Sequence, residues 1–336
     1  MRDRTRREFV SGLTLAGTAG LLGVLPGTAS AKPPPETTTL RIAEGRPGIC
    51  IAPQYVAADL LRSEGFTDVQ YLSKATLAER LQALATGEAQ MTVTFVPSLI
   101  SRVDAGDPII VLAGSHVGCF ELFGTERVGA IRDLKGKSVA ISGKGGADHL
   151  FLSVILLQLG LDPRRDVNLV VSPPAGTIRL LTEGKIDAVL HFPPAPQEFR
   201  ARKIGHVILN SSIDRPWSQY FCCVVAAHRD FVRKHPVATK RAVRAIVKAA
   251  DVCALEPERT ARFLVDKGYA ERYDYALQAL RDVPYAKWRE YNPEDAVRFY
   301  SLRLHEAGLI KSSPQKILTQ GTDWRFLNEL KKELKG

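Results

Sequence analysis

From Leu40 onward, short apolar runs alternate with amphipathic segments along the chain. The apolar runs predict strands at 40–43, 69–72, 91–96 and 109–113. The segments between them predict helices at 53–63, from Thr76 to a stop at Gly87, and at 97–105. A regular alternation of this kind favours parallel strands covered by helices.

The same pattern restarts in the middle of the chain. Strands are expected at 138–142, 167–171 and 186–190, with a glycine turn at 143–146, a very apolar helix at about 148–159 and another helix ending at Gly184. The two halves also align over a short stretch, because Leu81, Leu84 and Gly87 match Ile178, Leu181 and Gly184 in register. This repeat suggests two similar α/β lobes.

The last third of the chain has a helical pattern. A strand is expected at 220–225, after which His235-Pro236 opens a long helix that runs through Ala254. Further helix starts are expected at the prolines, since proline is favoured in the first turn of a helix; these are Pro257, Pro284, Pro293 and Pro314.

The first 31 residues have the layout of an export signal. A start rich in arginine (Arg2, Arg4, Arg6, Arg7) leads into an apolar run at about 12–25, and Ala29-Ser30-Ala31 supplies small residues for cleavage. The segment at 5–10, with Phe9 two residues after Arg6-Arg7, resembles the twin-arginine pattern. We therefore expect a twin-arginine signal peptide at 1–31 and export by the Tat machinery. We expect a soluble mature protein without a lipid anchor, because the first cysteine is Cys50 and no later apolar run is long enough to span a bilayer.

Composition narrows the class of ligand. The chain has a net charge of +10, and removing the signal's four arginines, Asp3 and Glu8 leaves about +8, which suits an anionic ligand or partner. No basic run is interleaved with aromatic residues, so nucleic-acid binding is not expected. The five cysteines are expected to be buried thiols rather than a disulfide framework, although a bridge such as Cys50–Cys119 stays open.

Four short sequence segments, in their order and spacing, carry a family resemblance. They are Ala52-Pro53-Gln54-Tyr55-Val56-Ala57, Asp133-Leu134-Lys135-Gly136-Lys137-Ser138-Val139-Ala140, Glu183-Gly184-Lys185-Ile186-Asp187-Ala188 and Phe231-Val232-Arg233-Lys234-His235-Pro236. With them, the chain from about Leu40 to Leu330 resembles the sulfonate/nitrate/taurine-type periplasmic substrate-binding proteins of ABC importers. These belong to the thiamine-pyrimidine-synthase-like superfamily.

The resemblance implies a fold and a function. The implied fold is the two-lobed α/β periplasmic-binding-protein fold (type II), with two parallel-rich sheets, flanking helices and a helical C-terminal tail. Lobe 1 would comprise 32–116 and 222–336, and lobe 2 would comprise 117–221, with crossovers near 114–123 and 217–225. The implied function is a monomeric periplasmic receptor that delivers a small anionic or aromatic organic ligand to an ABC importer permease. No cofactor, metal or catalytic residue is expected.

Candidate ligand-binding residues follow from the cleft of such a fold, where loops at the carboxyl ends of parallel strands meet helix N-termini. Three loops qualify and contribute Arg46, Gly48 and Ile49; Phe95; and Lys144, Gly145 and Gly146. The crossovers and their surroundings add Ser115, His116, Phe192, Trp217 and Tyr220. Other interpretations stay open: the last loop as an ordinary strand-to-helix turn, Phe192 and Trp217 as core residues, and His116 as a hydrogen-bonded structural histidine.

The chief alternative is a thiamine-pyrimidine-synthase-like or decarboxylase-like enzyme on the same fold. The pyrimidine synthases carry a cysteine-rich motif, whereas this chain has only Cys222-Cys223 inside an apolar strand. The chain has no HExxH, nucleophile elbow or Cys-x-x-Cys motif. A site assembled from His116, His149 and His191 stays open, but the sequence favours a binding protein over an enzyme.

Overall fold

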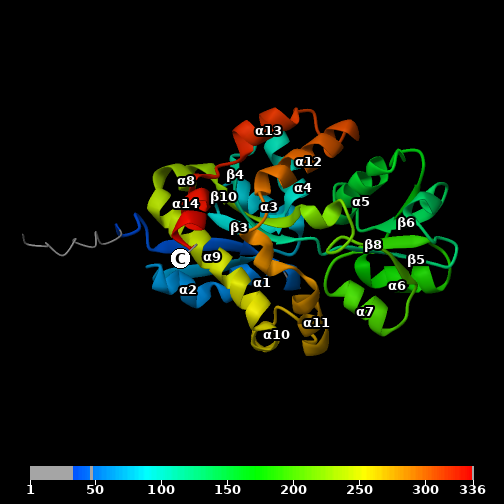
Figure 1. The fold of residues 1–336 in the computed structure, drawn as a ribbon, viewed down its shortest axis with the longest axis horizontal. Coiled ribbons are helices and arrows are strands. Elements are labelled where there is room, and N and C mark those ends of the chain that lie inside the picture. The colour runs from blue at the N-terminus through cyan, green and yellow to red at the C-terminus, as the bar shows by residue number, and fades with distance from the viewer. Residues whose placement is uncertain (1–32, 46–47, 335–336) are drawn as a thin grey trace, which may run out of the picture. The chain divides into compact units, whose positions relative to one another are not determined.

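The computed structural model describes residues 33–45 and 48–334 (Figure 1). The predicted signal peptide at 1–31 and the candidate ligand residue Arg46 lie outside the described residues. In the described part of the chain, no helix is both long enough and apolar enough to cross a lipid bilayer.

The strands of the described residues form two sheets of five. The first sheet has the order β2-β1-β3-β10-β4 and the second has the order β7-β6-β8-β5-β9. The first contains β1 (Thr39–Glu44), β2 (Asp68–Ser73), β3 (Met91–Phe95), β4 (Ile109–Val117) and β10 (Phe221–His228). The second contains β5 (Glu121–Gly124), β6 (Ser138–Ile141), β7 (Asn168–Val171), β8 (Ala188–His191) and β9 (His206–Asn210).

The two sheets share one topology. In each, three strands pair in parallel, β1 with β2 and β3 in the first sheet and β6 with β7 and β8 in the second. One antiparallel strand lies beside these three parallel strands in each sheet, next to β3 in the first and next to β8 in the second. It is the first strand that the chain forms after it crosses from the other sheet. That strand is β5 in the second sheet and β10 in the first. The prediction of two repeated α/β units is therefore confirmed, with one antiparallel strand in each sheet.

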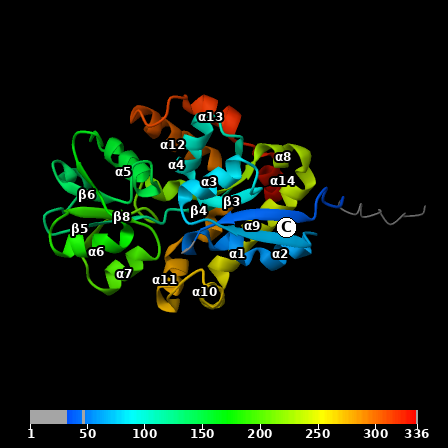
Figure 2. The same ribbon diagram turned by 180° about the vertical axis from the view of Figure 1, so that it is seen from behind.

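Helices cover both faces of each sheet. In both views, α3 and α4 lie on one side of the first sheet and α1 and α2 on the other, while α5 is opposite α6 and α7 across the second sheet (Figures 1 and 2). The helices of the first part of the chain are α1 (Ala52–Val56), α2 (Ala58–Ser63), α3 (Leu77–Ala85), α4 (Val96–Asp104), α5 (Ala147–Gln158), α6 (Pro174–Thr182) and α7 (Ala195–Ala201).

The predicted helical C-terminal part follows β10. It contains α8 (Arg229–Lys234), α9 (Pro236–Leu255), α10 (Pro257–Asp266), α11 (Tyr273–Asp282), α12 (Pro293–Glu306), α13 (Pro314–Gly321) and α14 (Arg325–Glu333). Proline occupies the first turn of α9, α10, α12 and α13, where its missing N–H costs no helical hydrogen bond. Short 3-10 helices complete the chain: η1 (Ile49–Ile51), η2 (Ile131–Leu134), η3 (Trp217–Gln219) and η4 (Tyr285–Trp288).

The main hydrophobic core contains residues of both sheets and of the C-terminal helices, and a smaller cluster lies on the second sheet. All nine residues of β4 are buried, as expected for a strand covered on both faces. After β4 the chain crosses toward the second sheet at Gly118, whose φ is +28°. A side chain there would meet the Ser211 backbone, because a Cβ would lie 2.1 Å from the carbonyl oxygen of Ser211. The crossover therefore requires glycine at this position.

Candidate functional site

A pocket of about 170 Å³ lies where the carboxyl ends of β1, β2, β3 and β8 meet the start of α3 and α5. This is the place where ligands bind in open α/β sheets, because loops and helix N-termini converge there. Its volume is similar to that of an engineered cavity of about 150 Å³ that holds benzene, so the pocket suits a small solute. The lining residues are Gly45, Gly48, Cys50, Ile51, Lys74, Ala75, Thr76, Leu77, Arg80, Thr94, Phe95, Cys119, Phe120, Ala147, Phe192 and Cys223.

The loop after β1 forms one wall and approaches its neighbours closely at Gly48. A Cβ at Gly48 would lie 2.6 Å from the Tyr55 hydroxyl and 2.7 Å from the Gly45 carbonyl oxygen. The Tyr55 hydroxyl donates a hydrogen bond to that carbonyl oxygen at 2.9 Å. The Tyr55 ring is in turn stacked on Tyr269, with 3.8 Å between centroids. Gly48 is therefore required for the loop to pack against Tyr55.

Arg80 in the first turn of α3 is the pocket cation without a carboxylate partner among the described residues. Its Nη2 lies 3.4 Å from the Thr94 hydroxyl oxygen, while its buried Nε has no hydrogen-bond partner in the described part of the chain. The second lysine or arginine of the lining, Lys74, is neutralised by Glu88 at 2.6 Å. A half-buried, unpaired guanidinium beside a cavity is a ready partner for an anion.

Three aromatic rings form another part of the lining. Phe95 at the end of β3 packs against Phe120 with 5.1 Å between centroids, and Phe120 packs against Phe192 with 5.4 Å between centroids. Phe192 follows β8 and is 39% exposed, whereas Phe95 and Phe120 are buried. Such a wall offers an apolar surface to the body of a ligand whose polar group is held elsewhere.

Thiols form a further part of the lining. All five cysteines belong to the described residues, all are buried, and none forms a disulfide. This confirms the expectation of buried thiols. Cys50 in η1, Cys119 in the crossover after β4 and Cys223 in β10 line the pocket, and the sulfurs of Cys119 and Cys222 are 3.3 Å apart. Hydrogen bonds from the Cys119 and Cys223 thiols lower the pKa of Cys50 well below its ordinary value.

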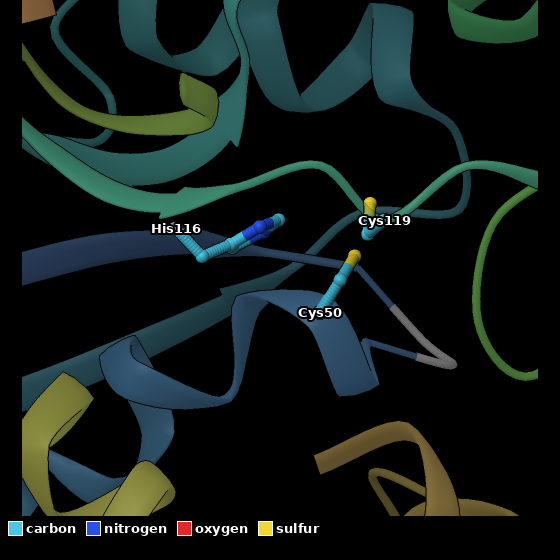
Figure 3. Close-up of side chains that lie close together, drawn as sticks. All are labelled: Cys50, His116 and Cys119. Carbon is cyan, nitrogen blue, oxygen red and sulfur yellow. The ribbon is translucent and has the colours of Figure 1, made fainter. Parts of the chain in front are cut away.

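His116 on β4 lies next to these thiols. Figure 3 shows the Cys50 side chain pointing toward Cys119, and the His116 ring extending toward the same region. One potential metal-ligating atom of each of the three residues lies within 4.8 Å of the other two. The backbone supports this arrangement, because the Cys119 N–H donates to the Ser211 hydroxyl oxygen at 3.1 Å.

The glycine turn after β6 was a candidate anion site, but its polar groups are hydrogen-bonded within the chain. Its Ser142 N–H and hydroxyl donate to the carboxylate of Asp148, the latter at 2.7 Å, and the Gly145 N–H donates to His149 Nδ1 at 3.1 Å. The Gly146 N–H donates to the Gly143 carbonyl oxygen at 3.1 Å. Lys144 is exposed and faces another hollow, with His149, so that only Ala147 from this loop reaches the pocket.

The remaining candidates pack away from the pocket lining. Ile49 is buried and its carbonyl oxygen accepts from the Tyr285 hydroxyl at 2.7 Å. Ser115 and Trp217 are buried, and Tyr220 stacks on Phe299 with 4.0 Å between centroids. Of the twelve predicted ligand residues, the pocket lining contains Gly48, Phe95 and Phe192. Ligand contact by any of the twelve stays a prediction.

The three histidines considered for a catalytic site are not brought together. His116 lies on the first sheet, His149 in the first turn of α5, and His191 at the end of β8. His191 Nε2 lies 2.8 Å from the Thr177 hydroxyl oxygen, and burial lowers the pKa of His191 to about 4, so it is neutral at physiological pH.

A family model matches more than half of the chain and so shows the family of the protein. The profile of the NMT1-like family matches residues 34–265. The chain belongs to the NMT1-like family. A search of curated proteins gave no match for this NMT1-like chain.

Solved structures similar to this NMT1-like chain include two periplasmic binding proteins. The periplasmic nitrate-binding protein NrtA from Synechocystis PCC 6803 is 17% identical, with a TM-score of 0.74 over 90% of each chain. The periplasmic aliphatic sulphonate binding protein SsuA from Escherichia coli is 17% identical, with a TM-score of 0.69 over 83% of this chain and 91% of SsuA. The desulfurization enzyme DSZB is 16% identical, with a TM-score of 0.59 over 88% of this chain and 99% of DSZB. At this identity the comparisons establish the fold, and they confirm the predicted resemblance to the nitrate and sulfonate type.

Several pocket residues of this NMT1-like chain were not among the predicted ones. Arg80 had one detectable signal, since a cation in the first turn of a helix opposes the helix dipole and so suggests a role outside the helix. Cys50, Cys119 and Cys223 had none, because only the folded chain brings residues so distant in sequence together.

Proposed function

We propose that this protein is an extracytoplasmic solute-binding receptor that holds a small anionic organic solute, with an apolar or aromatic body, in the pocket beside Arg80. The observation that carries this proposal is the Arg80 guanidinium, which lines the pocket without a carboxylate partner among the described residues. A partly buried charge is costly unless an opposite charge accompanies it. A bound anion would supply that charge.

Other residues of the pocket lining would contact the rest of the ligand. The ligand's anionic group would lie against Arg80 and the Thr94 hydroxyl, which are 3.4 Å apart. Its body would lie against the rings of Phe95, Phe120 and Phe192. The volume of about 170 Å³ limits that body to roughly the size of a benzene ring.

The names of the similar structures support this class of ligand. NrtA is described as nitrate-binding and SsuA as binding aliphatic sulphonates, and both are described as periplasmic. By analogy, we propose export through a twin-arginine signal at 1–31, a location in the periplasm and delivery of the solute to an ABC importer permease.

The proposed lobes are those expected from the sequence, 32–116 with 222–336 and 117–221. The pocket is lined from both, since Arg80 and Cys50 belong to the first and Cys119 and Phe192 to the second. A ligand that contacts both lobes would favour a closed arrangement through its differential affinity for that state. A monomer is sufficient for this proposed role.

Calorimetric titration of the purified protein with nitrate, methanesulfonate, taurine and benzenesulfonate tests the proposal. We expect stoichiometric binding of at least one of these anions and a raised melting temperature. Arg80→Gln is expected to weaken binding by roughly 1.5–3 kcal/mol, the range for a hydrogen bond to a charged group. Arg298→Gln, which removes an exposed arginine paired with Glu294, is the matched control and should leave the affinity unchanged.

A second candidate function, catalysis by a thiol, is favoured by the surroundings of Cys50 and by one of the similar structures. Cys50 lines the pocket, its pKa is lowered by hydrogen bonds from Cys119 and Cys223, and one similar structure is described as a desulfurization enzyme. Incubation of the protein with the same anions, followed by product analysis, distinguishes the two functions. Binding without product supports the receptor, whereas product formation that Cys50→Ser abolishes would replace it with an enzyme.

A further inference from the structure

We propose that Cys50, Cys119 and His116 form a binding site for one thiophilic metal ion, of which Zn²⁺ is the best match, at the floor of the pocket. The inference goes beyond the proposed function and does not depend on it. Cys50 comes from η1, His116 from β4 and Cys119 from the crossover that follows β4. No metal site was expected from the sequence, and no single segment of the chain carries all three residues.

The spacing of the ligand atoms is close to that of a coordination shell. The three ligand atoms lie within 4.8 Å of one another. In a tetrahedral zinc site with Zn–S of about 2.3 Å and Zn–N of about 2.0 Å, ligand atoms are roughly 3.5–3.8 Å apart. Rotations of the Cys50 and Cys119 side chains that shorten the longest separation by about an ångström would complete the shell. Figure 3 shows the three side chains converging from two stretches of the chain, η1 and the stretch that runs from β4 into the crossover.

The orientation of His116 is the second, independent observation. The ring is fully buried, and its Nδ1 lies 3.1 Å from the Val117 carbonyl oxygen. A carbonyl oxygen can only accept, so Nδ1 carries the proton and Nε2 carries the lone pair. Nε2 is buried and has no hydrogen-bond partner among the described residues. Metal-bound histidines commonly show this arrangement, in which one ring nitrogen donates to a carbonyl oxygen and the other coordinates the metal.

The donor set and its charge select the type of ion. Two thiolates and one imidazole favour Zn²⁺ or Cu⁺ over Mg²⁺ or Ca²⁺, which prefer oxygen ligands. Two thiolates and Zn²⁺ have a net charge of zero, which suits a buried site. Cys50 and Cys119 both line the pocket, so a bound ion would keep a fourth position directed toward it.

Zinc titration of reduced, chelator-treated protein against a chromophoric competitor tests the site. We expect one Zn²⁺ per chain, and Co²⁺ in its place should give the intense visible and charge-transfer bands of tetrahedral sulfur coordination. Cys50→Ser, Cys119→Ser and His116→Gln should each weaken zinc binding by roughly 10–100-fold or more. Cys253→Ser is the matched control, because Cys253 is an equally buried thiol in α9 that is not part of the group.

Either of two results would overturn the proposal. One is wild-type protein that binds no Zn²⁺, and the other is Cys50→Ser and His116→Gln variants that bind it as tightly as wild type. If Cys119→Ser does not fold, as checked by circular dichroism, the other two variants still decide the result. The titration contains none of the anionic solutes tested for the receptor function, so a negative result here leaves the anion-binding experiment with Arg80→Gln unaffected, and the reverse also holds.

Discussion

Two glycine-containing loops occupy equivalent places in the two sheets but have different electrostatic partners. One spans Gly45 to Gly48 after β1, and the other spans Gly143 to Gly146 after β6. Each follows the central strand of a parallel trio and precedes a helical segment. The sequence suggested both as places for an anion, because glycine lets backbone N–H groups approach one.

In the second loop, the chain supplies the anion itself. The Asp148 carboxylate is buried and accepts hydrogen bonds from the Ser142 N–H, the Ser142 hydroxyl and the His149 N–H. The first loop faces a pocket in which Arg80 is a cation without a carboxylate partner among the described residues. Glycine spacing therefore indicates where backbone N–H groups can bind an anion. Whether an external anion can bind there depends on whether a carboxylate of the chain already occupies the loop.

Removal of the internal carboxylate should have the largest effect. Asp148→Ala is expected to lower the free energy of unfolding by about 3 kcal/mol or more, since hydrogen bonds to a charged group contribute roughly 1.5–3 kcal/mol each. Added sulfate should raise the melting temperature of this variant more than that of wild type, because the emptied loop becomes an anion site. Asp133→Ala, at an exposed carboxylate that accepts from Gly129 and Ala130, is the control and should show no such rescue. Equal sulfate responses in all three proteins would contradict this account of the loop.

A pH effect of similar size is expected at His191, which is buried in the same lobe and feels the Asp148 charge. Burial lowers the pKa of His191 to about 4, against about 6.5 in the unfolded chain. Between these values the unfolded state binds a proton that the folded state does not, so stability falls as the pH falls through this window. From pH 7.5 to 4.5 the loss should be about 2–3 kcal/mol.

The matched variant for this prediction is His191→Gln, whose amide can still hydrogen-bond to the Thr177 hydroxyl. Urea unfolding at the two pH values should give a smaller loss for the variant than for wild type. If both proteins lose stability equally, His191 is not the group responsible.

A smaller effect is expected from a methyl group in the first loop. Gly48→Ala would place a Cβ 2.6 Å from the Tyr55 hydroxyl and 2.7 Å from the Gly45 carbonyl oxygen, so the loop must shift. We expect a loss of about 1–3 kcal/mol in the free energy of unfolding, as for overpacking of a tight site, together with weaker anion binding. Thermal unfolding and calorimetry measure the two effects. Wild-type values for both would show that the close approach is not needed.

The smallest effect is expected from the same change in the second loop. None of the described atoms lies within 4 Å of a Cβ built at Gly143. Gly143→Ala should therefore change stability by no more than about 0.5 kcal/mol and leave anion affinity unchanged. A loss of affinity as large as that of Gly48→Ala would remove the distinction between the loops.

Most of the fold could be predicted because its signals are local. The predicted strand at 109–113 is the first part of β4, and the helix opened by His235-Pro236 is α9, since burial and helix starts leave patterns in neighbouring residues. The strand β9 was not predicted. Four of its five residues, His206, Val207, Ile208 and Asn210, are exposed or half-buried, which weakens the apolar pattern that marks a strand.

The pocket could be predicted in position but only partly in composition. Gly48 and Phe95 are recognisable because they end or follow predicted strands, at the edge where parallel strands place ligands. The role of Arg80 depends on how α3 packs beside β3, and the contact between Cys119 and Cys222 joins residues 103 positions apart. Such contacts follow from tertiary packing and leave no pattern in the local sequence.

A crystal structure of the protein with its tightest-binding small anion would show whether Arg80 or the second loop binds that anion. We expect an anion within hydrogen-bond distance of the Arg80 guanidinium, with its body against Phe95 and Phe192, and with Asp148 still hydrogen-bonded to Ser142. An anion bound in the Gly143–Gly146 loop in place of the Asp148 carboxylate, or an empty pocket at a saturating concentration, would contradict this expectation.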